Sequence, residues 1–251
     1  MTRHRTRWAA LLVVATLPLA LSACRGNPTT ARPTSDQTSP ATDVVPSDTV
    51  QQPWTLLADE PEDVLLAAGP YALTANGSAR RLAVVRVPEG YMNHGGWTVI
   101  SGEPFHAVGY LTAALAFRDP CGSSSRSKYT TTSDPGPTVA DLAEALVTQK
   151  GARTSTPVPV TVDGHAGLYL EYQVSPRVDV ASCEDRAFDL FTTGPGGGWY
   201  LEASRERADI WILDVGGDRV VLAWVAAPGV TRAQMSDMTD TVRSTRFVDP
   251  G

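Results

Sequence analysis

Hydrophobic and polar positions change their spacing several times between residues 54 and 250, and each change predicts an element. Residues 158–162 and 168–174 alternate apolar and polar positions, which is the period of a strand with one face buried. Asp163-Gly164 lies between them and supplies the positive φ angles that a two-residue turn needs. The two segments therefore predict a β-hairpin.

The same reasoning predicts further extended segments along the chain. They are residues 82–87, 97–100 and 107–117, a pair at 188–190 and 199–201, a last hairpin of 210–215 and 219–226 across Gly216-Gly217, and a short apolar tail at 247–248. Turn residues bound most of these segments, so each strand is short.

One segment between Thr138 and Gly151 has helical spacing instead. Val139, Leu142 and Leu146 recur on one face of a helix with a period of 3.6. Thr138 is suited to cap its first turn, and Gly151 is placed to end it.

A second helix is predicted near the end of the chain. Thr231 and Gln234 match a capping box, and Met235, Met238 and Val242 line one face. Together the elements predict an α+β fold, with an antiparallel β-sheet packed with two main helices, in a single domain over residues 54–250.

Several short segments resemble a known fold family. Val84-Val-Arg-Val-Pro-Glu-Gly-Tyr91 is similar to the opening strand and Pro-x-Gly-aromatic turn of PsbP/Mog1-like proteins, and the terminal helix ends in Arg-Ser-Thr-Arg-Phe247. The resemblance covers about residues 80 to 248 and implies an α/β/α sandwich, a fold shared by some envelope lipoproteins of high-G+C Gram-positive bacteria. That family has no common catalytic residues to transfer, and its members are mostly binding or assembly factors.

The N-terminus has the pattern of an export signal. Arg3, Arg5 and Arg7 precede an uncharged apolar run over residues 8–21, which is shorter than a membrane-spanning helix. The following Leu-Ser-Ala-Cys24 resembles a bacterial lipobox, which implies a signal peptide over residues 1–23 and a diacylated thiol at Cys24. An ordinary signal peptide cut before Cys24 is the alternative.

Residues 24–53 are rich in Thr, Pro and Ser and lack aromatic side chains. Such a segment buries too little apolar area to offset its ordering entropy, so we expect a disordered tether after the lipidated cysteine. The expected location is the outer face of the cytoplasmic membrane, held by the lipid anchor. The net charge of −6, which removal of the three arginines makes more acidic, does not suit nucleic acid as a partner.

Two cysteines remain once Cys24 is assigned to lipid. Cys121 and Cys183 form an even pair in an exported domain, and we predict a disulfide between them. Two buried free thiols are the alternative. The sequence shows no motif with metal-ligand spacing, and we expect neither a metal nor a cofactor.

Candidate catalytic residues each have a simpler interpretation. Ser125-Arg-Ser-Lys128 matches a Ser-x-x-Lys nucleophile motif, but it lies in a Ser-rich loop without the motifs that accompany it, which favours a solvated loop. His94, His106 and His165 have no paired-ligand spacing and are expected at the surface or half-buried. Gly194-Pro-Gly-Gly-Gly198 leads into a strand rather than a helix, so a hairpin loop is favoured over a phosphate loop.

The tryptophans allow two interpretations. Trp211 and Trp224 share strand faces with leucine and valine, which favours core packing. Trp97, Trp199 and Tyr200 also lie on or beside strands, where an aromatic ligand cleft is the other interpretation. The sequence favours a non-enzymatic binding or accessory module with an envelope protein or ligand as its partner. A carrier of a hydrophobic envelope ligand and an unrecognised hydrolase are the alternatives.

Overall fold

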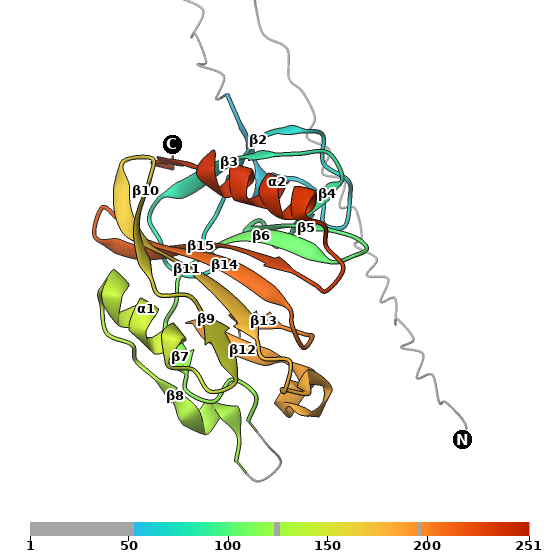
Figure 1. The fold of residues 1–251 in the computed structure, drawn as a ribbon. Helices are drawn as coiled ribbons and strands as arrows, with labels where there is room; N and C mark the ends of the chain where they lie inside the picture. The colour runs from blue at the N-terminus through green and yellow to red at the C-terminus, as the bar shows by residue number, and fades with distance from the viewer. Residues whose placement is uncertain (1–52, 123–125, 195–196, 251) are drawn as a thin grey trace, which may run out of the picture. The chain divides into compact units, whose positions relative to one another are not determined.

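The computed structural model describes residues 53–122, 126–194 and 197–250, and these fall within one compact unit (Figure 1). The expected signal peptide, Cys24 and almost all of the expected tether lie outside the described residues. Two α-helices are present in the described part, α1 (Val139–Val147) and α2 (Arg232–Arg243). The predicted capping box opens α2, and at α1 the predicted cap Thr138 forms a capping box with Asp141.

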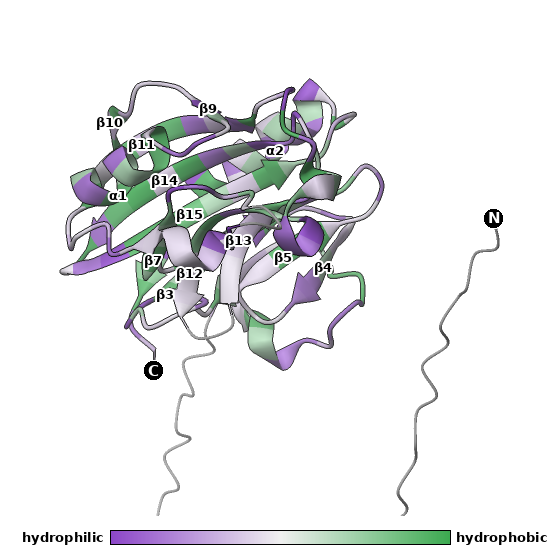
Figure 2. Cartoon of the chain, turned by 90° about the horizontal axis from the view of Figure 1, so that it is seen from below, coloured by the Kyte–Doolittle hydropathy of each residue, from purple (hydrophilic) through white to green (hydrophobic). Residues whose placement is uncertain are grey.

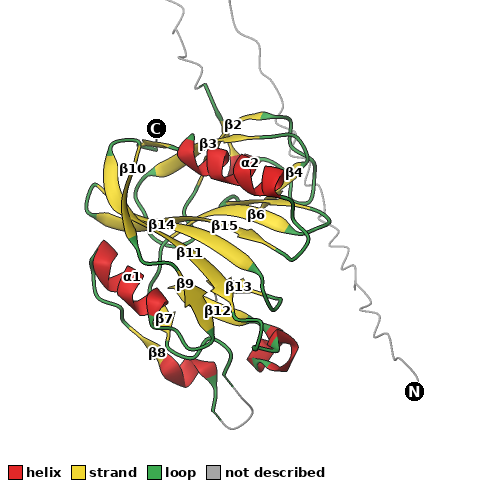
Figure 3. Cartoon of the chain, viewed as in Figure 1, coloured by secondary structure: helices red, strands yellow, loops and turns green. Residues whose placement is uncertain are grey.

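Strands dominate the fold (Figure 3). They are β1 (Thr55–Leu56), β2 (Gly69–Leu73), β3 (Leu82–Val87), β4 (Tyr91–His94), β5 (Thr98–Ser101), β6 (His106–Leu111), β7 (Leu115–Phe117), β8 (Thr132–Ser133), β9 (Ala152–Thr154), β10 (Val158–Val162), β11 (His165–Val174), β12 (Phe188–Gly194), β13 (Gly197–Leu201), β14 (Arg207–Val215), β15 (Asp218–Ala226) and β16 (Arg246–Val248). Short 3-10 turns at Leu57–Asp59, Lys128–Thr131, Val180–Ser182 and Glu184–Arg186 complete the described elements.

A large antiparallel sheet runs through the middle of the molecule, with strand order β10-β11-β14-β15-β6-β5-β4 and β9 added beside β11. Both predicted hairpins belong to it. Asp163 and Gly164 have positive φ between β10 and β11, as do Gly216 and Gly217 between β14 and β15. The α+β class and the antiparallel sheet predicted from the sequence are therefore confirmed.

Each face of this sheet is covered by its own layer. The strand order β1-β2-β3-β16 forms one small sheet, which joins α2 in a hydrophobic core on one face. The strand order β13-β12-β7-β8 forms another, which joins α1 in a second core on the opposite face. Figure 2 shows the central strands largely in green, because their side chains are apolar on both faces.

Strand alternation decides which core each residue joins. On β14, Ile210 and Ile212 belong to the core with α1, whereas Trp211 and Leu213 belong to the core with α2. Leu142 of α1 is fully buried in the core with α1. The predicted apolar face of α1 is therefore the face that packs on the sheet.

Two local predictions are wrong in detail. The apolar run 107–117 is two strands, because Leu111 pairs with Val221 of the large sheet while Ala116 pairs with Phe191 of a small one. The first helix ends at Val147, before Gly151, and the backbone N–H of Thr148 closes its last turn. In the described part, no helix is long and apolar enough to cross a membrane.

Candidate functional site

A cleft of about 420 Å³ opens where β13 of a small sheet meets the edge of the large sheet. We call it the aromatic cleft. It is lined by Asn76, His94, Trp97, Thr98, Ile100, Phe105, Ala107, Gly197, Gly198, Trp199, Tyr200, Glu202, Glu206 and Val225. Its volume lies within the range of small-molecule sites.

Aromatic rings form much of the wall. Trp97, just before β5, and Trp199 of β13 meet edge to face with ring centroids 6.0 Å apart. Phe105 and Tyr200 also line the cleft, and both are exposed. Exposed rings around a concavity offer flat apolar surfaces on which the ring of a ligand can stack.

Gly109 allows the two sheets to approach at the base of the cleft. A Cβ atom at this position would lie 2.9 Å from Cζ3 of Trp199 and 3.0 Å from Oγ1 of Thr98. A glycine on β6 therefore leaves room for the indole of Trp199 against the large sheet. Trp199 and Thr98 face each other across this glycine.

Two polar atoms in the cleft wall are buried without a hydrogen-bond partner among the described residues. They are Nε1 of Trp199 and Oγ1 of Thr98, and both side chains are more than nine-tenths buried. A buried indole N–H can only donate, and leaving it unpaired costs free energy. Both atoms are enclosed by the surrounding side chains, so they contribute to the packing under the cleft wall and not to its exposed surface.

Acidic side chains bound another part of the cleft. Glu206 is buried, and its carboxylate accepts the backbone N–H groups of Glu202 at 2.6 Å and of Ala203 at 2.8 Å. Burial raises the pKa of Glu206 above its ordinary value. Glu202 is exposed beside it, and neither lysine nor arginine is among the lining residues.

The tryptophans were open to two interpretations, core packing and an aromatic cleft, and each holds for two of them. Trp211 and Trp224 are buried in the core with α2, and Nε1 of Trp224 donates to Thr239 Oγ1 at 3.1 Å. Trp97 and Trp199 line the cleft instead. The local sequence carries a signal for this difference, since the cleft tryptophans follow Gly-Gly pairs and the core tryptophans alternate with leucine and valine.

The predicted disulfide lies away from the cleft lining. The sulfur atoms of Cys121 and Cys183 are 2.00 Å apart, and their Cα atoms are 4.6 Å apart. The bond joins the loop after β7 to the turn before β12. Next to it, the backbone N–H of Glu184 donates to the carbonyl of Cys121 at 2.9 Å.

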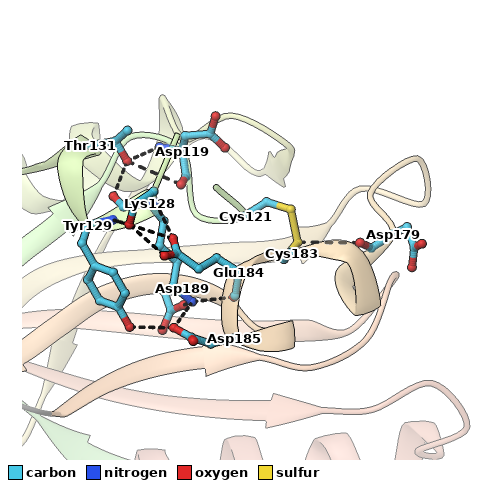
Figure 4. Close-up of polar contacts among 11 residues, drawn as sticks. Asp119, Cys121, Lys128, Tyr129, Thr131, Asp179, Cys183, Glu184, Asp185 and Asp189 are labelled. Atoms are coloured by element: carbon cyan, nitrogen blue, oxygen red, sulfur yellow. Dashed lines mark hydrogen bonds and ion pairs between the residues drawn. A yellow bond between two sulfur atoms is a disulfide. The ribbon is translucent and has the colours of Figure 1, made fainter. Parts of the chain in front are cut away.

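Lys128 lies beside this disulfide and is buried, so the prediction of a solvated loop is wrong for this residue (Figure 4). Its ammonium group pairs with the carboxylates of Asp189 and Asp185 and donates to the carbonyl of Glu184 at 2.8 Å. Its backbone N–H donates to the Glu184 carboxylate at 2.7 Å. Ser125 of the Ser-x-x-Lys motif lies outside the described residues.

The groups around Lys128 have shifted acidities. Burial raises the pKa of Asp189, although the Lys128 ammonium opposes this shift. The hydroxyl of Tyr129 donates to Asp185 at 2.9 Å, which lowers the pKa of Asp185 and raises that of Tyr129 to about 12. Because the ammonium group is enclosed by protein and already paired, this cluster acts as a link between two loops.

The histidines do not form a site together. His94 is exposed in the cleft wall and His165 is half-buried, as expected. His106 is buried, which corrects the expectation of a surface or half-buried position. Its Nδ1 lies 2.8 Å from the carbonyl oxygen of Pro104, and its ring meets Tyr91 edge to face. Within the described ranges no group of His, Cys, Asp and Glu is arranged to hold a metal ion.

Comparisons with family models and with curated protein sequences give no match for this chain.

Proposed function

We propose that this chain is a membrane-anchored extracytoplasmic lipoprotein whose domain binds a small ring-bearing molecule in the aromatic cleft without transforming it. One observation carries the proposal. The cleft combines a ring-lined wall, on which Phe105 and Tyr200 are exposed, with the carboxylate-bearing Glu202 and Glu206 in the same lining. A ring would stack on this wall, and its polar group would face the acidic side of the cleft.

The proposed location rests on the sequence. A basic start, an uncharged apolar run and Cys24 after Leu-Ser-Ala give the arrangement of a lipoprotein signal. A disulfide between Cys121 and Cys183 is compatible with an oxidising compartment. The lipid would keep the binding domain at the outer face of the cytoplasmic membrane.

The proposed fold family is PsbP/Mog1-like. Its support is the layered arrangement, with the antiparallel sheet between α1 and α2, and the predicted turn after β3 at Pro88-Glu-Gly90. Members of that family are mostly binding or assembly factors, which agrees with a cleft that binds. Fold alone does not establish function, so the cleft remains the basis of the proposal.

A carrier of an acyl chain fits the cleft less well. A hydrocarbon chain would place apolar surface against the carboxylate of Glu206 in the lining. A hydrolase also fits less well, because the cluster with a buried lysine is closed. In the cleft lining Thr98 pairs with His94 across β4 and β5, but its hydroxyl has no hydrogen bond to a base among the described residues.

The binding proposal is tested with three benzyl probes of similar size that all carry an oxygen acceptor. They are benzyl(2-hydroxyethyl)dimethylammonium, 2-(benzyloxy)ethanol and (benzyloxy)acetate. The full chain in phosphatidylcholine nanodiscs is titrated with each probe by calorimetry, and empty nanodiscs serve as the blank. We expect saturable binding of at least one probe.

Matched variants locate the binding. Phe105→Ala removes a ring from the cleft wall and should weaken binding at least threefold. Leu115→Ala removes a similarly exposed apolar side chain that does not line the cleft, and it should leave binding unchanged. The proposal is overturned if none of the three probes binds, or if the two variants have the same effect.

Anchoring is tested separately. Cys24→Ser should abolish lipidation and shift the protein from the detergent phase to the aqueous phase in a partitioning experiment, since stable anchoring needs more than one acyl chain. Unchanged partitioning of this variant would overturn the lipid assignment and leave the binding proposal standing.

A further inference from the structure

The ionisable groups of the described cleft lining are two carboxylates, an imidazole and a phenol, from Glu202, Glu206, His94 and Tyr200. Glu202 and Glu206 are the acidic lining residues, and the described lining includes no lysine or arginine. Tyr200 shares this environment. Its pKa is raised mainly by burial, with further contributions from the charges of Glu202 and Asp189. Carboxylates therefore border the same wall that presents the aromatic rings.

Aromatic faces add to this potential. The face of an indole or phenol ring carries partial negative charge and attracts a cation that sits within about 6 Å of its centre. Trp97, Trp199, Phe105 and Tyr200 all line the cleft, together with the two carboxylates. Rings and carboxylates therefore favour the same sign of charge on a ligand.

We infer that the ligand of the aromatic cleft is an organic cation, with an ammonium or similar group between the aromatic rings and the carboxylates of Glu202 and Glu206. This inference rests on the proposed function and assigns its ligand class. Anionic molecules of the same shape are rejected, because entering the cleft would bring a negative charge against a buried carboxylate that has no lysine or arginine beside it among the described lining residues.

The two carboxylates have different parts in this site. Glu206 is fixed, since its carboxylate accepts two backbone N–H groups at 2.6 and 2.8 Å. Glu202 is exposed and its side chain is free to approach a bound cation from the solvent side. A fixed charge and an adaptable one can together enclose a compact cationic group.

The three benzyl probes test the inference because they differ chiefly in charge. Titrations of the full chain in phosphatidylcholine nanodiscs should show the ammonium probe binding about tenfold more tightly than the neutral ether, a difference that cation–π contacts and carboxylates can supply. The carboxylate probe should bind at least tenfold more weakly than the neutral ether.

Charge-removing variants assign the preference to the named residues. Glu202→Gln should lower the affinity for the ammonium probe about threefold, and adding Glu206→Gln should bring it close to that of the neutral ether. The affinity for the neutral ether should stay within about twofold in both variants, which shows that the cleft is still formed. Glu144→Gln changes an exposed acid of α1 outside the cleft and serves as the control.

The outcomes separate this inference from the proposed function. If the neutral or the anionic probe binds as tightly as the ammonium probe, the cation inference is overturned while the binding cleft stands. A cation preference that survives in the double variant overturns the role of Glu202 and Glu206. If none of the probes binds, the proposed function is overturned and the inference with it.

Discussion

Trp97 lies in the turn just before β5 of the large sheet and Trp199 lies on β13 of a small sheet, and their rings meet edge to face at an interplanar angle of 69° with centroids 6.0 Å apart. This contact joins the edge of the large sheet to β13. It also places both indoles in the wall of the aromatic cleft. Packing between the sheets and the shape of the candidate site therefore depend on the same pair of side chains.

Replacement of Gly109 by alanine should disturb this arrangement. The new Cβ would lie 2.9 Å from Cζ3 of Trp199, so the indole must shift toward the cleft. We expect at least threefold weaker binding of the tightest benzyl probe and a change in tryptophan emission. Gly102→Ala is the matched control, because no atom lies within 4 Å of its added Cβ. Equal affinities of the two variants would contradict the assigned role of Gly109.

Lys128 should matter for stability well beyond an ordinary surface lysine. Lys128→Met leaves the buried carboxylate of Asp189 without its cation and should lower the free energy of unfolding by about 3 to 5 kcal/mol in urea denaturation. The double variant with Asp189→Leu should recover most of this loss. Lys150→Met is the control, since its side chain is 77% exposed in its pair with Asp119, and a change below about 1 kcal/mol is expected. A similarly small effect at Lys128 would show that its burial is not energetically important.

Asp209 should make stability depend on pH. It accepts the Tyr169 hydroxyl at 2.8 Å, and burial raises its pKa from 3.8 to about 6. The folded state therefore holds this proton more tightly than the unfolded state, and stability falls as the pH rises from about 4 to about 6. Asp209→Asn removes this loss and should gain roughly 3 kcal/mol over the wild type above about pH 7, but little at about pH 4.

The measurement is urea denaturation of both proteins across this pH range. Glu144→Gln, an exposed carboxylate on α1, is the control and should follow the wild type. An Asp209→Asn variant whose stability difference does not change with pH would contradict the burial argument.

The apolar face of α1 should carry a large share of the stability of its core. Leu142 is 0% exposed, so Leu142→Ala should lower the free energy of unfolding by about 2 to 5 kcal/mol. Val147→Ala on the same helix removes a side chain that is 38% exposed and should change it by less than about 1 kcal/mol. Equal effects in thermal or urea unfolding would mean that α1 packs differently.

Local features of the fold were predictable from the sequence. The turn at Asp163-Gly164 and the capping boxes at Thr138 and Thr231 depend on residues a few positions apart, so their pattern is complete in a short window. The break near Ala113 was not predictable in this way. Its carbonyl accepts a hydrogen bond from Arg219, and the chain leaves the large sheet for a small one there, both of which depend on tertiary structure.

The candidate site was likewise predictable only in part from the sequence. Trp97 and Trp199 were recognised as possible cleft residues, but which aromatic residues line the cleft depends on how β13 packs on the large sheet. The burial of Lys128 was missed because its partner Asp189 lies far along the chain. Glu206 was missed as well, since nothing in its local sequence distinguishes a buried carboxylate from a solvated one.

The central claim, that the aromatic cleft is the binding site, is tested most directly by ¹⁹F NMR of the full chain labelled with 5-fluorotryptophan in phosphatidylcholine nanodiscs. Signals are assigned by single Trp→Phe variants, and benzyl(2-hydroxyethyl)dimethylammonium is added. The account predicts saturable shifts at Trp97 and Trp199, which line the cleft, and unchanged signals at Trp211 and Trp224, which lie in the core with α2. Unchanged signals at all four positions, or equal shifts in both pairs, would contradict it.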